Sequence, residues 1–177
     1  MHYQEKVKEF MTVFGQDCPA DPTIPDLKTR ILRVKLLLEE VLELTEASGL
    51  KIVDSMGIEF NKELLGKIDG VEVIENPEKS PDIVEIADAL ADISYVNYGA
   101  ANAYGIDIHP VEQEVHDSNM TKLFNKEEVQ SLAPGEYDII QVSENRYLVK
   151  NLTGKVQKSP SYTPANIRKH VKYEIFG

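Results

Sequence analysis

Apolar residues recur at the three- and four-residue spacing of amphipathic helices in four stretches of the chain. Gly15, Gly49 and Gly105 follow the first three stretches and act as stop signals. The third stretch has the sharpest start, with Ser80 predicted as the N-cap and Pro81 as the first helical residue. The predicted helices cover residues 3–14, 26–48, 80–104 and 109–123. The pattern therefore predicts a mainly α fold, a helical bundle of about four core helices.

Residues 50–79 interrupt this helical pattern. Residues 52–56 either extend a helix or start a loop, and residues 70–77 form either a short strand or an irregular excursion. We interpret residues 50–79 as a mobile insertion between the second and third helices.

The C-terminal part of the chain has a different pattern. Residues 137–142 and 146–150 are rich in β-branched and aromatic side chains on either side of a polar turn, which predicts a β-hairpin. The predicted organisation is an all-α domain of residues 1–126 followed by a C-terminal β-hairpin extension of residues 127–177.

Two groups of carboxylates interrupt the apolar stripes of the second and third helices. Ionised carboxylates are rarely buried unless they are paired or bind a cation. Residues three or four apart share one surface of a helix, so each group gathers on a single face. Carboxylate oxygens suit magnesium, with manganese as the alternative, and magnesium bound in this way usually keeps a substrate phosphate in its shell. The acids are Glu39, Glu40 and Glu43 in one helix and Glu85, Asp88 and Asp92 in the other.

Solvated helix faces are the alternative explanation, because glutamate is a good helix former. Asn119 and Lys122 lie three residues apart and could orient and neutralise a phosphate, although an ordinary polar helix end explains them as well. Arg30 and Arg33 either bind phosphate or pair with the surplus acids.

Overall charge and composition narrow the class of protein. The net charge of −11 argues against broad binding of nucleic acid, which needs a basic face. The single cysteine, Cys18, excludes an intramolecular disulfide and favours a reducing compartment. No apolar run approaches the roughly 18 residues of a membrane span, and the first residues lack the apolar core of a signal peptide. We therefore expect a cytoplasmic protein.

The acidic motifs resemble the E-E-x-x-E and E-x-x-D signature of the all-α nucleoside triphosphate pyrophosphohydrolases. That superfamily includes MazG-like enzymes, dimeric dUTPases and phosphoribosyl-ATP pyrophosphohydrolases, and the chain is most similar to proteins of the last type. The resemblance covers most of the chain and is strengthened by the Ser-Asn-Met-Thr-Lys run that contains Asn119 and Lys122.

This resemblance implies hydrolysis between the α and β phosphates of a nucleotide, releasing a monophosphate and pyrophosphate. It implies Glu40, Glu43, Glu85 and Asp88 as metal ligands, and Glu39 as a ligand to a further ion or as the base that activates water. Asp92 offers a rival alignment to Asp88. Asn119 and Lys122 would contact phosphate. The resemblance further implies a homodimer, or a dimer of dimers, with the active site near a subunit interface.

The alternative function is a helical dimer that binds a nucleotide without cleaving it and has a regulatory role. A panel of triphosphates with magnesium separates the two, because only the enzyme releases pyrophosphate. Neither base nor sugar can be assigned from these residues, since likeness at metal ligands says little about them.

Overall fold

The computed structural model describes residues 2–54 and 71–171. Contacts divide the chain into two compact units, residues 1–106 (unit 1) and 107–177 (unit 2), and each is described by itself. The predicted domains of residues 1–126 and 127–177 stay a prediction, because a division by contacts does not test which part folds alone.

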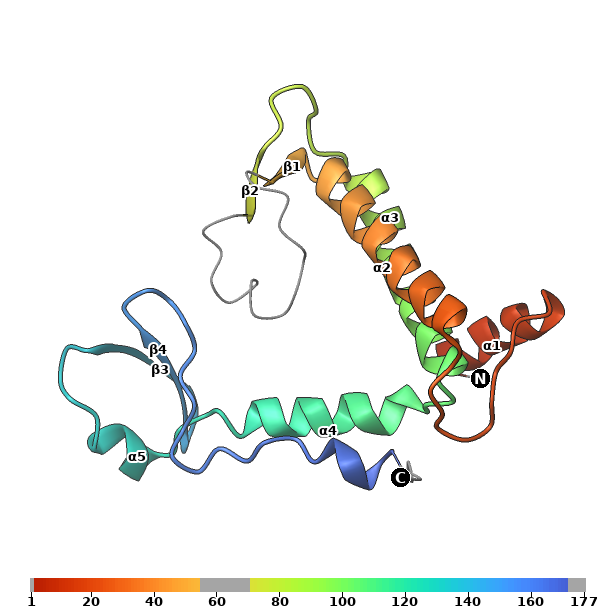
Figure 1. Cartoon of the computed structure of the whole chain (residues 1–177). Coiled ribbons are helices and arrows are strands. Elements are labelled where there is room, and N and C mark those ends of the chain that lie inside the picture. The colour runs from red at the N-terminus through yellow and green to blue at the C-terminus, as the bar shows by residue number, and fades with distance from the viewer. Residues whose placement is uncertain (1, 55–70, 172–177) are drawn as a thin grey trace. The chain divides into compact units, whose positions relative to one another are not determined.

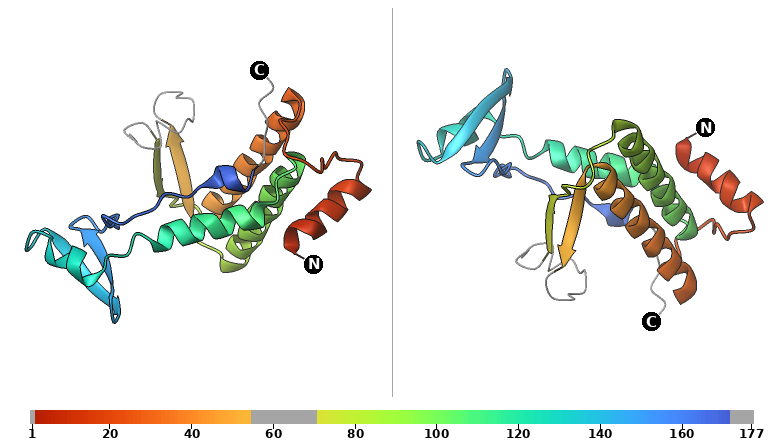
Figure 2. Two further views of the ribbon diagram at one scale, coloured as in Figure 1. Left: turned by 90° about the horizontal axis from the view of Figure 1, so that it is seen from below. Right: turned by 90° about the horizontal axis from the view of Figure 1, so that it is seen from above.

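Unit 1 is built on three helices, α1 (Tyr3–Val13), α2 (Leu27–Ala47) and α3 (Ile83–Ala103). Helix α3 lies between the other two and packs against both, and α2 and α3 run antiparallel (Figures 1 and 2). These three helices match the first three predicted stretches. The fold class, mainly α with a small C-terminal hairpin, is confirmed.

Aspartate side chains cap the two long helices. The Asp26 carboxylate accepts a hydrogen bond from the backbone N–H of Thr29 at 2.7 Å. The Asp82 carboxylate accepts from the N–H groups of Val84 and Glu85, at 2.8 and 3.3 Å. The prediction of Ser80 as the N-cap of the third helix was therefore wrong by two residues. The Asp82 carboxylate pairs with two N–H groups that have no partner within the helix, and its negative charge interacts favourably with the positive end of the helix dipole.

A two-stranded antiparallel sheet follows α2. Strand β1 (Leu50–Asp54) pairs with β2 (Val71–Glu75), with Leu50 opposite Glu75. Residues 50–54 thus form a strand, so the prediction of a helix extension or loop for residues 52–56 was wrong over its first part. The strand alternative for residues 70–77 was right. The predicted mobility of the insertion falls largely on residues 55–70, which lie outside the described residues.

The core of unit 1 joins α1 to the C-terminal half of α3. Val7 and Met11 are almost completely buried against Ala103. A polar pair lies beside them: the Gln4 amide donates to the Asn102 side-chain oxygen at 3.0 Å, and the Asn102 amide donates back to the Gln4 carbonyl at 3.1 Å. Each buried amide thereby finds a partner, which fixes the register of α1 on α3.

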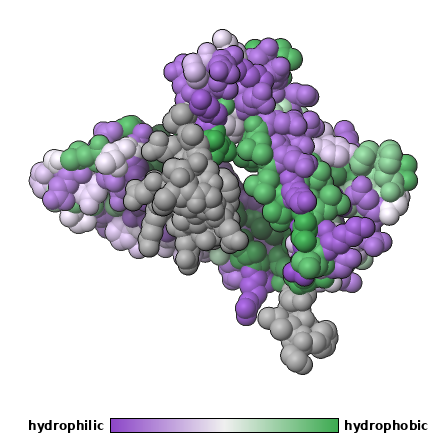
Figure 3. All heavy atoms as spheres, turned by 45° about the horizontal axis from the view of Figure 1, so that its top comes forward, coloured by the Kyte–Doolittle hydropathy of each residue, from purple (hydrophilic) through white to green (hydrophobic). Residues whose placement is uncertain are grey.

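Much of the apolar surface of α2 is exposed in the single chain. Leu38 is 49% exposed and Leu42 is 56% exposed, and Ile31, Val34 and Val41 are similar. The space-filling view shows apolar side chains at the surface over the long helices of unit 1 (Figure 3). The apolar stripe that predicted a helix is therefore real, but the chain itself covers only part of it.

Unit 2 combines α4 (Ile108–Met120), α5 (Lys126–Gln130), β3 (Tyr137–Ser143), β4 (Arg146–Asn151) and a 3-10 turn, η1 (Ile167–Lys169). Strands β3 and β4 form the predicted antiparallel hairpin, with an irregularity between Gln141 and Ser143. Helix α4 ends three residues before the predicted end. Helix α5 was not predicted, although Asn125 and Glu128 form the capping box that marks its start.

No helix among the residues that the structure describes is both long enough and apolar enough to cross a membrane.

Gly105 allows the linker between α1 and α2 to close against the end of α3. Its φ is +65°, and a Cβ at this position would overlap the backbone carbonyl of Asp21. Gly15 has a similar φ of +70°, but a Cβ there would meet nothing within 4 Å.

We expect Gly105→Ala to lower the free energy of unfolding by about 2–4 kcal/mol, because it adds a backbone collision to the left-handed strain. Gly15→Ala should cost only about 1–2 kcal/mol, since strain is its sole penalty. Urea unfolding followed by circular dichroism measures both. Equal losses in the two variants would show that the contact with Asp21 does not matter.

Candidate active site

Glu40 lies where the acidic face of α2 meets α3. It is half-buried, and this loss of hydration raises the pKa of its carboxyl. The negative charges of Glu43, Asp92, Glu39 and Asp88, in that order, raise the pKa further. Two carboxylates of α3, 48 and 52 residues further along the chain, therefore influence the pKa of Glu40. Asp88 and Asp92 of the second predicted group thus lie near Glu40 of the first.

The antiparallel packing of α2 and α3 explains why these acids meet. A Cβ on Gly99 would lie 3.3 Å from Nη1 of Arg33, so these two positions face each other. Glu40 lies seven residues beyond Arg33, and Asp92 lies seven residues before Gly99. Seven residues are close to two helical turns, which returns both side chains to the same shared face. The register set at Gly99 therefore places Glu40 opposite Asp92.

Glu85 has a different partner. Its carboxylate lies 3.3 Å from Nζ of Lys79, and the same Nζ lies 3.3 Å from the carboxylate of Glu46. Hydrogen bonding to Glu85 is the largest cause of a raised pKa at Lys79. Glu85 is not among the charges that raise the pKa of Glu40, whereas Asp88 and Asp92 are. Of the predicted acids on α3, the two aspartates are thus the ones that raise the pKa of Glu40 on α2.

The acids share a face without forming a finished metal site. Glu40 is half-buried, whereas Glu39, Glu43, Asp88 and Asp92 are exposed. Within residues 2–54 and 71–171, no three histidine, cysteine or carboxylate side chains are arranged as a group that could hold a metal ion. The oxygen donors nevertheless have the chemistry that magnesium or manganese takes. The metal ligands remain a prediction.

The two arginines of α2 lie in different surroundings. Arg30 is exposed. Arg33 is only 7% exposed, and its Nη2 donates to the side-chain oxygen of Gln16 at 2.8 Å. Burial lowers the pKa of the Arg33 guanidinium from its usual value. Their predicted role in phosphate binding stays untested.

Asn119 and Lys122 lie at the end of α4 in unit 2. The Lys122 ammonium donates to the Asn119 side-chain oxygen at 2.7 Å, in an exposed position. The side chains of Asn119 and Lys122 therefore lie on one face, as their three-residue spacing predicted. An amide and an ammonium at this spacing offer several donors and could both reach one phosphate oxygen cluster, which is what the sequence predicted.

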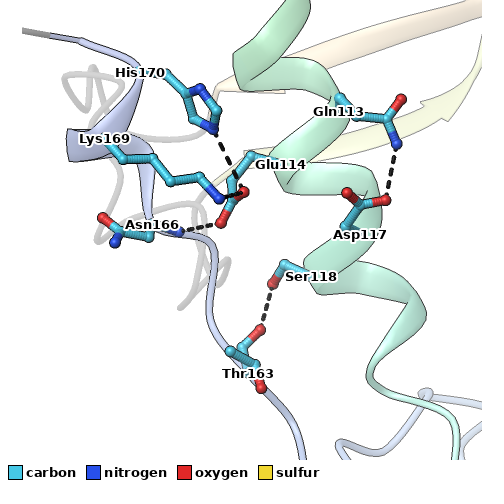
Figure 4. Close-up of polar contacts among 8 residues, drawn as sticks. All are labelled: Gln113, Glu114, Asp117, Ser118, Thr163, Asn166, Lys169 and His170. Carbon is cyan, nitrogen blue, oxygen red and sulfur yellow. Dashed lines mark hydrogen bonds and ion pairs between the residues drawn. The ribbon is translucent and has the colours of Figure 1, made fainter.

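Residues 163–170 bind along α4, a contact that the sequence did not reveal (Figure 4). The Ser118 hydroxyl donates to the carbonyl of Thr163 at 2.8 Å, and Ser118 is buried. One turn earlier, the Glu114 carboxylate accepts from the backbone N–H of Asn166 at 2.8 Å and pairs with Lys169. The partners are 45 to 55 residues apart. No local pattern could have found them.

Glu114 is the most strongly perturbed acid in this contact. Its side chain is 15% exposed, and His170 Nε2 lies 3.5 Å from it in addition to Lys169. Hydrogen bonds from Lys169 and from the Asn166 N–H lower the pKa of Glu114 from 4.5 to about 2. The C-terminal segment therefore holds the helix that ends in Asn119 and Lys122 through an ionised carboxylate.

A model of the phosphoribosyl-ATP pyrophosphohydrolase family matches residues 7–119. The match spans all three helices of unit 1 and extends through α4 to Asn119. No curated protein matches the chain.

The contact between Glu114 and the C-terminal segment should depend on pH. Because folding lowers the pKa of Glu114 from 4.5 to about 2, its stabilising effect is complete above pH 4.5 and is lost as the pH falls toward 2. We expect the hydrogen-exchange protection of the Asn166 amide to fall across that window. Glu114→Gln should show weaker protection above pH 4.5 and no such titration.

Asp117→Asn is the matched control, because Asp117 also lies on α4 but accepts from Gln113 on its own helix. In Asp117→Asn, the protection of the Asn166 amide should fall between pH 4.5 and 2 as it does in the unaltered protein. Protection at Asn166 that does not change between pH 4.5 and 2 would contradict the assignment.

Proposed function

We propose a function from one premise: the chain belongs to the phosphoribosyl-ATP pyrophosphohydrolase family. It is accordingly a hydrolase that acts on acid anhydrides, with nucleotides as the substrate class. The finer proposal is magnesium-dependent hydrolysis between the α and β phosphates. The substrate would be a nucleoside or deoxynucleoside triphosphate, or a related nucleotide such as phosphoribosyl-ATP, and the products a monophosphate and pyrophosphate.

One observation carries the finer proposal: α3 brings Asp88 and Asp92 near Glu40 of α2, and burial together with the neighbouring negative charges raises the pKa of Glu40. Like charges in one place repel one another, and a bound cation or a proton relieves that repulsion. A pyrophosphate ester is highly anionic and cannot approach such a face unless a cation also intervenes. A divalent ion held by oxygen donors would reduce the repulsion among the carboxylates and also the repulsion between them and the phosphates.

Glu43, Asp88 and Asp92 are the residues that we propose to hold the ion, with Glu40 beside them. When bound, magnesium would neutralise phosphate oxygens and make a coordinated water more acidic. In the proposed reaction, a water oxygen would form a bond to the α phosphorus as the bond from that phosphorus to the bridging oxygen breaks. Pyrophosphate leaves with the electron pair.

Glu40 is suited to accept the proton of the attacking water. Burial and the neighbouring negative charges raise the pKa of Glu40, which makes its carboxylate a stronger base than that of an ordinary glutamate. Glu39 is the alternative base, or a ligand to a further ion. Glu85 would join the ligands only by leaving Lys79. Asn119 and Lys122 are the proposed contacts to phosphate.

The exposed apolar stripe of α2 supports a second part of the proposal, a homodimer. Leu38, Val41 and Leu42 stand exposed in the single chain although they alternate with the acidic residues of the site. A second copy would bury these side chains and exclude water from the neighbouring carboxylates, which strengthens their electrostatic interactions. Cytoplasmic localisation remains the expectation from the single cysteine.

We expect Glu43→Gln and Asp92→Asn each to reduce magnesium-dependent release of pyrophosphate by more than about 100-fold, because even outer partners of a metal site are worth about 10- to 100-fold. The assay is a panel of nucleoside triphosphates and phosphoribosyl-ATP, with pyrophosphate as the readout. Glu9→Gln is the control, since Glu9 is exposed on α1 and makes the same change of charge.

Turnover that survives in both variants would contradict the assignment of these ligands. Diphosphate and orthophosphate as products would contradict cleavage between the α and β phosphates. Tight nucleotide binding with no product from any member of the panel would favour the non-catalytic alternative.

The dimer can be tested at Leu38. We expect Leu38→Asp to raise the dissociation constant of the dimer at least about tenfold, because a buried unpaired carboxylate is costly. Leu152→Asp is the matched control, because Leu152 is 79% exposed in the turn that follows β4 of unit 2. Analytical ultracentrifugation measures both. An unaltered chain that sediments as a monomer at about 100 μM would contradict the homodimer.

A further inference from the structure

A second candidate site lies in unit 1, at the opposite end of α2 from strand β1. A cavity of about 790 Å³ opens between the linker that follows α1 and the first two turns of α2. Its volume is in the range of small-molecule sites, about 300–1,000 Å³. Gln16, Lys28 and Arg33 supply donors to its wall. Neither Glu40 nor any other member of the acidic face lines this cavity.

Arg33 is the unusual member of this wall. It is 93% buried, and its Nε is buried with no hydrogen-bond partner. The neutral amide of Gln16 accepts from its Nη2. Among residues 2–54 and 71–171, no carboxylate lies within ion-pair distance of this guanidinium. Buried arginines are normally paired with an anion, because an arginine cannot lose its charge to escape the cost of burial.

The packing on the far side of Arg33 leaves the guanidinium little room to move. Gly99 of α3 approaches so closely that an added Cβ would lie 3.3 Å from Nη1 and 3.8 Å from Val7. Helix α3 and the core of α1 thus hold the side chain on one side, and the cavity lies on another. A guanidinium fixed in this way is preorganised for a planar anion.

The charges of the wall restrict the anion. Lys28 and Arg33 are positive, whereas Asp17 and Asp26 are negative, so the wall is neutral overall. A ligand with two or more negative charges would be repelled by both aspartates. A single negative charge can pair with Arg33 and leave the aspartates solvated. Ile24, Pro25 and Leu32 add apolar surface for the body of such a ligand.

We propose that this cavity, the Arg33 cavity, binds a small organic monocarboxylate, with the carboxylate on the guanidinium of Arg33 and the apolar body against Ile24, Pro25 and Leu32. The site is separate from the acidic face, because Arg33 and Glu40 lie seven residues apart, about 10 Å along the helix. Binding requires neither magnesium nor a nucleotide. It does not depend on the proposed catalytic function.

Benzoate is the probe, and its neutral relative benzamide is the matched ligand control. We expect benzoate, in the absence of magnesium, to shift the Nε–H resonance of Arg33 in a saturable way, whereas benzamide should not. Inorganic phosphate should bind at least about tenfold more weakly than benzoate, because a charge-assisted hydrogen bond is offset by repulsion from two aspartates.

Two pairs of variants test the wall, with saturation-transfer NMR of benzoate as the readout. Arg33→Met should abolish binding, and Arg30→Met on the exposed face of the same helix should not. Lys28→Glu makes the wall negative at an exposed position and should weaken binding at least about tenfold. Lys35→Glu, the same change outside the cavity, should leave binding unchanged.

Lys28→Glu keeps the test valid if Arg33→Met does not fold. Three results with the unaltered protein would overturn the proposal: no saturable shift with benzoate, equal shifts with benzamide, or phosphate binding more tightly than benzoate. The absence of a saturable shift would mean that the guanidinium of Arg33 binds only water. Equal weakening by Lys28→Glu and Lys35→Glu would overturn it as well, because it would reflect net charge rather than this cavity.

Discussion

The antiparallel packing of α2 against α3 is the constraint on which unit 1 depends. Gly99 lets α3 approach Arg33 closely, and that register places Glu40 opposite Asp92, two turns along. The contact that stabilises the helix pair therefore also forces like charges together. Glu39, Glu43, Asp88 and Asp92 are exposed, so water screens much of this repulsion and the fold tolerates it.

Backbone contacts at the two ends of the helix pair keep this register. Near β1, the Asp82 N–H donates to the Ala47 carbonyl at 2.9 Å, and Gly49 turns the chain with a φ of +68°. At the other end, the Thr23 N–H donates to the Tyr104 carbonyl at 3.0 Å. Both helices are thereby tied at each end, whereas their apolar stripes stay half-exposed. These end contacts support the register set at Gly99, and an exposed apolar surface remains along the middle of α2.

The same helix pair withdraws two charges of opposite sign from water, Arg33 and Glu40. Arg33 and Glu40 share one face of α2. Arg33 is a buried cation that forms no ion pair with any carboxylate of the described residues, and Glu40 is a half-buried anion near other anions. Each is costly by itself, because burial disfavours the charged form of either group. Ligands of opposite sign would relieve both. In unit 2, Glu114 already has such partners within the chain, because Lys169 and the Asn166 N–H stabilise its ionised carboxylate and lower its pKa to about 2.

The sequence by itself determined the three helices of unit 1, the hairpin and the acidic motif, because helical spacing, stop glycines and turn residues act over a few neighbours. The start of α3 was missed by two residues, since Ser80 and Asp82 are rival caps and only the path of the chain selects one. Tertiary structure alone decided that Asp88 and Asp92 face Glu40 while Glu85 turns to Lys79. It also decided which arginine is buried. Periodicity places a side chain on a face of its helix, but the approach of a second helix determines what that face meets.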